Sequence, residues 1–189
     1  VYRRNGDDSN RMNELAPQAS LEAHPEFWKT IEPDLLPQTF EHMGDRYQDF
    51  LALRLVPELA ERFGLELDRE RTAVGGASMG GFASIYALTR HPQVWGTGLG
   101  VSTHWPFGGD PMVEDLLGRL PAVGEVRVWI DGGTESLDVN YAPHIAHAAK
   151  VLEAAGYKVG TDYEARVFEG AAHCEDDWAK RIDLIVNWW

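Results

Sequence analysis

The sequence predicts an α/β fold in which helices cover both faces of a mainly parallel sheet. From residue 45 onwards, short apolar runs alternate with amphipathic segments of helical length. This alternation is typical of parallel strands joined by crossover helices. Of the 189 residues, 44% are hydrophobic and 25% are charged. These values are typical of a single folded domain with a substantial core.

The first 44 residues predict a less regular part of that domain. Four prolines lie among the aromatic residues of the segment 16–44, and prolines at this density exclude a long helix. We expect an irregular segment with short helical turns, preceded by a strand end at Val1 and Tyr2. Residues 45–189 are expected to form the main body. It begins with an amphipathic helix that ends at Gly64, because apolar residues recur there at spacings of three and four.

The remaining elements follow from apolar runs and the glycines and prolines between them. Strands are expected at 72–74, 95–101, 125–130 and 163–168, and helices at 82–89, 112–120, 141–155 and 178–189. In such sheets, binding sites form beyond the carboxyl ends of the strands. The loops of interest are therefore 75–81, 102–110, 131–140 and 169–177.

The first of these loops reads GGASMGG and joins an expected strand to an expected helix. Residues 76–80 fit the pattern G-x-S-x-G, in which small neighbours let a strand and a helix approach closely around a strained serine. This context predicts Ser78 as an exposed nucleophile. The backbone N–H of Met79 would then donate to a developing oxyanion. The alternative interpretation is a tight turn without chemistry.

A serine hydroxyl needs a base, and a base needs an orienting carboxylate. Among seven histidines, His173 follows the last strand on a loop of small residues, which makes it the predicted base. The acid is expected after the strand 125–130, in the chain order serine, acid, histidine. Asp131 lies close to the strand end, whereas Glu135 and Asp138 lie further into the loop. Spacing does not separate these last two residues.

The motifs GGASMGG, RHPQVWGTGLGVSTHW, DGGTES and FEGAAHCEDDW occur in this order. With them, the chain resembles the esterase D / putative esterase family of α/β-hydrolases, which includes feruloyl esterases, siderophore-ester hydrolases and mycolyltransferase antigens. The resemblance implies an α/β-hydrolase fold. In this family the acid comes from a Gly-Thr-x-x-Glu or Gly-Thr-x-Asp segment, which favours Glu135 over Asp138. The resemblance also implies that His104 and Trp105 line a substrate pocket.

The resemblance implies a sheet of roughly eight strands, a size known among large α/β enzymes, but the sequence supplies about four. The strand before Ser78 would then lie at a sheet edge, with unpaired N–H and C=O groups. We expect either that the chain is the C-terminal part of a longer or nicked protein, or that a second chain or another copy covers this edge. A second oxyanion donor, which usually comes from an early loop, is also expected to be missing, with weakened activity as the result.

These observations predict a serine carboxylic-ester hydrolase that acts on a small-molecule ester through an acyl-enzyme. An acyltransferase of the same fold is an open alternative, as is a non-catalytic binding or interaction domain. Seventeen basic and thirty acidic residues give a net charge of −13, which argues against nucleic acid or an anionic membrane as partner. The sequence has no apolar run long enough to span a membrane. No metal or cofactor is expected, because the sequence has neither an HExxH motif nor a cysteine cluster.

Overall fold

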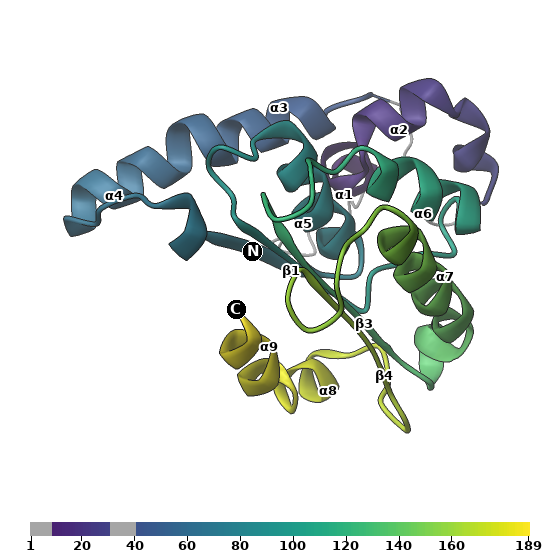
Figure 1. Cartoon of the computed structure of the whole chain (residues 1–189). Coiled ribbons are helices and arrows are strands. Elements are labelled where there is room, and N and C mark those ends of the chain that lie inside the picture. Colours follow the sequence, from purple (N-terminus) through teal and green to yellow (C-terminus); the bar gives the residue numbers. More distant parts are fainter. Residues whose placement is uncertain (1–8, 31–40) are drawn as a thin grey trace.

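The computed structural model describes residues 9–30 and 41–189. Four parallel strands form one sheet in the order β1-β2-β3-β4, with helices on both faces (Figure 1). The predicted α/β class is therefore confirmed. The strand end expected at Val1 and Tyr2 lies outside the described residues. The strands are β1 (Ala73–Ala77), β2 (Thr97–Val101), β3 (Arg127–Gly133) and β4 (Tyr163–Phe168).

The two faces of the sheet are covered unequally. One face carries the larger core, formed with α5 (Met79–Arg90), α6 (Gly109–Gly118) and α7 (Tyr141–Ala154). Outside these helices lie α1 (Ser9–Leu15), α2 (Gln18–Ala23) and the 3₁₀ turn η1 (Pro25–Thr30). The last two are the short helical turns expected in the segment 16–44. The other face is covered by two short helices, α8 (Glu175–Ala179) and α9 (Ile182–Trp188). The prediction of one helix over 178–189 is therefore wrong.

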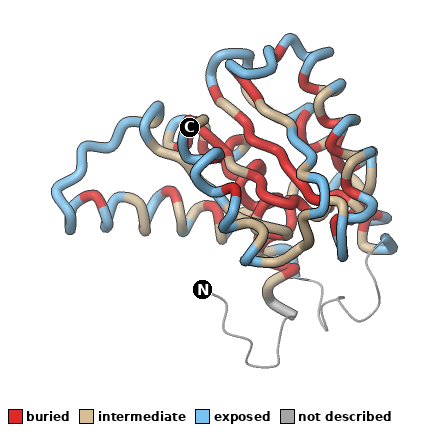
Figure 2. The backbone as a smooth tube through the Cα atoms, turned by 90° about the horizontal axis from the view of Figure 1, so that it is seen from below, coloured by how far each residue is buried: buried red, intermediate tan, exposed pale blue. Residues whose placement is uncertain are grey.

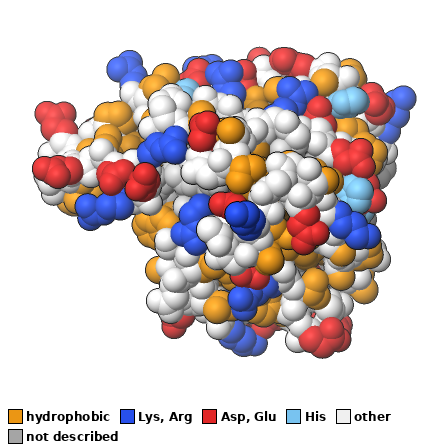
Figure 3. Space-filling model, in the orientation of Figure 1, with side chains coloured by type: hydrophobic (Ala, Val, Ile, Leu, Met, Phe, Trp, Pro, Cys, Tyr) orange, Lys and Arg blue, Asp and Glu red, His pale blue; other side chains and the backbone are white. Residues whose placement is uncertain are grey.

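The helix expected to end at Gly64 is present but largely exposed. It consists of α3 (Gly44–Phe50), the π-helical turn η3 (Leu51–Leu55) and α4 (Val56–Phe63), and Gly64 ends it with a left-handed φ of 63°. Its outer end projects from the body of the protein (Figures 1 and 2). Hydrophobic and charged side chains mix on this projection (Figure 3). Four of its apolar side chains are 40–66% exposed: Phe50, Leu53, Leu59 and Phe63.

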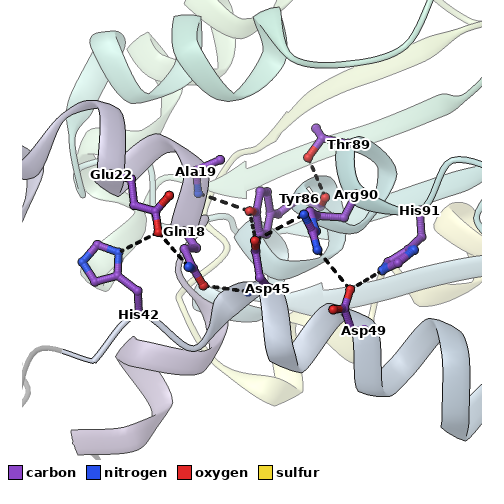
Figure 4. Close-up of polar contacts among 10 residues, drawn as sticks. All are labelled: Gln18, Ala19, Glu22, His42, Asp45, Asp49, Tyr86, Thr89, Arg90 and His91. Atoms are coloured by element: carbon purple, nitrogen blue, oxygen red, sulfur yellow. Dashed lines mark hydrogen bonds and ion pairs between the residues drawn. The ribbon is translucent and has the colours of Figure 1, made fainter.

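Polar contacts attach the inner end of this helix to α5 (Figure 4). Asp45 accepts a hydrogen bond from the Tyr86 hydroxyl and lies 3.2 Å from an Arg90 guanidinium nitrogen. Asp49 lies 3.1 Å from another guanidinium nitrogen of Arg90 and 2.8 Å from His91 Nε2. Arg90 and His91 belong to one of the motifs that carry the family resemblance. Their described contacts hold α3 against the helix that begins after Ser78.

Strand register brings the loops of interest to one edge of the sheet. Ala77 pairs with Val101, Gly100 with Ile130, and Gly133 with Phe168. Because all four strands run in parallel, the loops that follow them leave from the same side. Among the described residues, β1 has a strand only on its β2 side, so the strand before Ser78 lies at an edge as expected.

The turn after β1 requires glycine at some positions and not at others. A Cβ atom on Gly76 would lie 2.6 Å from the carbonyl oxygen of Gly80, whereas a Cβ on Gly80 would have open space around it. We predict that Gly76→Ala lowers the free energy of unfolding by about 1–3 kcal/mol, because the strand and the helix must move apart. Gly80→Ala should leave it unchanged or raise it by up to ~1 kcal/mol. Urea unfolding of both variants tests this, and equal effects would contradict it.

Candidate active site

Ser78 occupies a sharp turn between β1 and α5. Its backbone adopts φ 59° and ψ −122°, a conformation that is rare for residues other than glycine and stores strain of order 1–3 kcal/mol. Its N–H donates to the carbonyl oxygen of Val101 at 2.9 Å, which fixes the turn to β2. Gly81 permits the close approach, since a Cβ there would lie 2.2 Å from Thr103 Oγ1. Met79 begins α5, and the first N–H groups of a helix have no acceptor within it.

A buried carboxylate contacts the predicted base. Asp138, in the 3₁₀ turn η5 (Ser136–Asn140), is fully buried, and its Oδ1 lies 2.6 Å from His173 Nδ1. Its other oxygen, Oδ2, accepts from the backbone N–H of Gly133 at 2.7 Å and from the hydroxyl of Ser102 at 2.6 Å. The carboxylate therefore has partners on both oxygens.

Glu135, which the resemblance favours as the acid, is exposed. It precedes the turn η5 in an extended conformation, and that turn carries Asp138 back to the end of β3. The backbone N–H groups of Thr134 and Glu135 both donate to the carbonyl oxygen of Ala171 at 3.0 Å. The main chain at Glu135 thus holds the histidine loop, while Asp138 contacts the histidine ring. Of the two candidates that spacing left open, Asp138 therefore makes the described hydrogen bond to His173.

The contacts of Asp138 also fix the protonation pattern of the pair. Burial raises the pKa of Asp138, but the hydrogen bonds from His173, Ser102 and Gly133 outweigh it and lower the pKa below its ordinary value. An ionised carboxylate only accepts hydrogen bonds, so Nδ1 of His173 carries the proton. The Nε2 lone pair is then left to accept a proton, which is the property of a general base.

Aromatic rings hold His173 in place. Its side chain is 8% exposed, and it meets Trp178 edge-on at 5.1 Å and Tyr141 at 5.8 Å between ring centroids. Trp178 and Glu175 of α8 also line a cavity of about 500 Å³ together with Gly76 and Ala77 of β1. Helix α8, which follows His173, therefore lies beside β1, which precedes Ser78. The two residues nevertheless follow strands at opposite edges of the described sheet, Ser78 after β1 and His173 after β4.

His104 and Trp105, which the resemblance places in a substrate pocket, have different surroundings from each other. His104 forms a hydrogen bond with the Tyr141 hydroxyl. Burial lowers the pKa of His104 from 6.5 to about 4; the neighbouring His173 and Arg11 add to this effect, and Asp138 opposes it. Trp105 has no exposed surface and packs edge-on against Phe82 at 5.1 Å between ring centroids in the main core.

Sequence reasoning did not identify several residues of the site, and it expected another role for Asp131. Ser102 directly follows β2, so the rule on carboxyl ends of strands could have identified it. Asp131, weighed above as an acid, is buried and accepts from Arg181 Nη2 at 2.9 Å instead. Arg181 lies in the break between α8 and α9, and no signal in the sequence indicated its contact with β3. Tyr141 and Trp178 lie in segments that the sequence predicts only as helices.

In the described ranges, no three His, Cys, Asp or Glu side chains are grouped so that they could hold a metal ion. Nor does any helix in those ranges have the length and apolar character that crossing a bilayer requires.

The lowered pKa of His104 predicts a pH-dependent stability. Between pH 6.5 and about 4, the unfolded chain binds a proton at this residue and the folded chain does not, so the free energy of unfolding falls as pH falls. From pH 7.5 to pH 5 this single group should contribute a loss of about 2 kcal/mol. His104→Gln, which does not titrate, should reduce the loss measured by urea unfolding by that amount. An identical loss in both proteins would contradict the prediction.

Comparison with known proteins identifies the family of this chain. A family model described as Putative esterase matches residues 26–188. The enterobactin esterase from Shigella flexneri is similar in structure, with a TM-score of 0.61 and 20% identity over 95% of this chain and 40% of that chain. A ferulic acid esterase from Anaeromyces mucronatus has a TM-score of 0.57 and 19% identity over 82% of this chain and 57% of its own.

The chain thus spans about 40% to 57% of the length of these two structures, and the likenesses concern the fold. Among curated proteins, no match is found. The family model covers most of the chain and includes Ser78, Asp138 and His173. The resemblance seen in the sequence motifs is therefore confirmed, and the chain belongs to the Putative esterase family.

Proposed function

We propose that this chain carries the catalytic residues of a serine carboxylic-ester hydrolase, with Ser78 as nucleophile, His173 as base and Asp138 as the orienting acid. The observation that carries the proposal is the 2.6 Å contact between Asp138 Oδ1 and His173 Nδ1. It is supported by the strained turn at Ser78, which leaves that residue half-buried at the carboxyl end of β1.

The proposed reaction has two steps, acylation of Ser78 and hydrolysis of the acyl-enzyme. The Ser78 oxygen attacks the ester carbonyl carbon while His173 Nε2 takes the hydroxyl proton, and the N–H of Met79 donates to the oxyanion. The intermediate collapses when the C–O bond to the alcohol breaks and His173 returns the proton to the leaving oxygen. Water then attacks the acyl carbonyl carbon and gives a proton to His173. The C–O bond to Ser78 breaks as His173 returns that proton to the Ser78 oxygen, and the carboxylic acid leaves.

Two of the structural neighbours supply the first esters to assay. They are esterases of enterobactin and of ferulic acid. We therefore propose enterobactin and feruloyl esters as the first substrates to assay. Because the chain spans less than two thirds of those structures, the rates expected of it alone are low.

A fluorophosphonate probe tests the nucleophile directly. We predict covalent labelling of Ser78, found by mass spectrometry of the modified peptide, and loss of labelling and of hydrolysis in Ser78→Ala. Activity loss from dismantling such a triad is on the order of 10⁶-fold. Hydrolysis that persists in a folded Ser78→Ala variant would refute the assignment. Ser84→Ala, another serine of the same region, is the matched control and should label normally.

The choice of acid is tested by two matched amide substitutions. Asp138→Asn should lower kcat by about 10⁴-fold, because an amide at this position no longer holds Nδ1 of His173 as the donor. Glu135→Gln should leave kcat close to that of the unmodified protein, since the Glu135 side chain is exposed. Steady-state kinetics on one chromogenic ester compares the two. A larger loss in Glu135→Gln would return the role to Glu135.

A further inference from the structure

We propose that Ser102 is a positioning residue for the acid of this site, and that Arg181 and Trp178 orient its hydroxyl. The inference rests on the proposed function, because the residue positioned is Asp138. It assigns a role in the esterase reaction to a serine that does not contact substrate.

The geometry around the Ser102 hydroxyl determines where its proton points. Ser102 is fully buried, and its Oγ lies 2.6 Å from Asp138 Oδ2, 2.7 Å from Arg181 Nη2 and 3.1 Å from Trp178 Nε1. A hydroxyl has one proton and two lone pairs. Guanidinium and indole N–H groups can only donate, so they occupy the two lone pairs. The single proton of Ser102 is therefore directed to Asp138.

A second carboxylate, that of Asp131, binds both the backbone of Ser102 and the Arg181 guanidinium. Asp131 Oδ1 accepts from the backbone N–H of Ser102 and from Arg181 Nη2, both at 2.9 Å, and its Oδ2 accepts from Trp129 Nε1 at 2.7 Å. Asp131 and Arg181 are 0% and 4% exposed. Ser102 itself has a left-handed φ of 39°, a conformation that a buried serine adopts only when its surroundings enforce it.

The arrangement has two consequences for the reacting pair. Ser102 and the N–H of Gly133 occupy Oδ2 of Asp138, so Oδ1 is left for His173. A donor that is itself polarised by the Arg181 cation also draws negative charge away from the carboxylate. Without the Ser102 hydroxyl, the Asp138 carboxylate would stabilise the protonated form of His173 more strongly. His173 would then act as a base only at higher pH.

The experiment compares Ser102→Gly and Ser102→Ala with the control Ser84→Ala. Glycine suits the left-handed backbone at position 102, so this variant removes the hydroxyl without adding strain. Ser84 is also buried, but its hydroxyl donates to the carbonyl oxygen of Gly80 at 2.7 Å within α5. Both Ser102 variants should lower kcat by about 10- to 100-fold, the effect of losing one hydrogen bond to a charged group, with KM nearly unchanged. The acid limb of the kcat/KM profile should move to higher pH, and Ser84→Ala should show neither change.

A spectroscopic readout makes the test independent of activity. The Nδ1–H proton of His173 should give a downfield resonance, assigned by its absence in His173→Gln, and this resonance should shift in Ser102→Gly but not in Ser84→Ala. A folded Ser102→Gly variant with unchanged kcat, pH profile and resonance would overturn the inference. If Ser78→Ala retained activity, the proposed function would fail instead. The resonance would still decide whether Ser102 controls the pair.

Discussion

The buried ion pair between Asp131 and Arg181 is the interaction on which the site depends. Burial raises the pKa of Asp131 against the opposing effects of Arg181, Trp129 and Ser102, so ionising this carboxylate is costly. A buried pair of this kind contributes little net stability, because desolvation offsets the attraction between the charges. What it provides here is geometry. One carboxylate on β3 holds the end of β2, through Ser102, and the junction of α8 with α9, through Arg181.

From that pair, a line of hydrogen bonds runs to the histidine. Arg181 donates to Ser102, Ser102 donates to Asp138, and Asp138 accepts from His173. Each hydrogen bond in this line limits the groups that the next residue has left to donate or accept with. The Arg181 cation therefore lies, with Ser102 between them, behind the carboxylate that would stabilise a protonated histidine. The ring is thus held by neighbours in η5, α7 and α8, and not by its own loop alone.

Much of the fold could be predicted from the sequence, because strand and helix periods and the glycines around Ser78 are local signals. The site was less accessible. Glu135 and Asp138 lie three residues apart in one loop, and contacts with Ala171 and Gly133 decide between them. The break between α8 and α9 coincides with Arg181, whose partner Asp131 is 50 residues away in the chain. The sequence pattern carried no information about either contact.

The strand order has a consequence for how activity and stability are related. Ser78 follows β1 and His173 follows β4, the two margins of the sheet, whereas Ser102 and Asp138 follow the central strands β2 and β3. Edge elements open locally at lower free energy than the whole domain unfolds. Detachment of β1 separates nucleophile from base while the polar network of Ser102, Asp131 and Arg181 stays folded. Inactivation by heat or denaturant should therefore precede the loss of helical structure, because the reacting pair is divided between the two strands that are easiest to release.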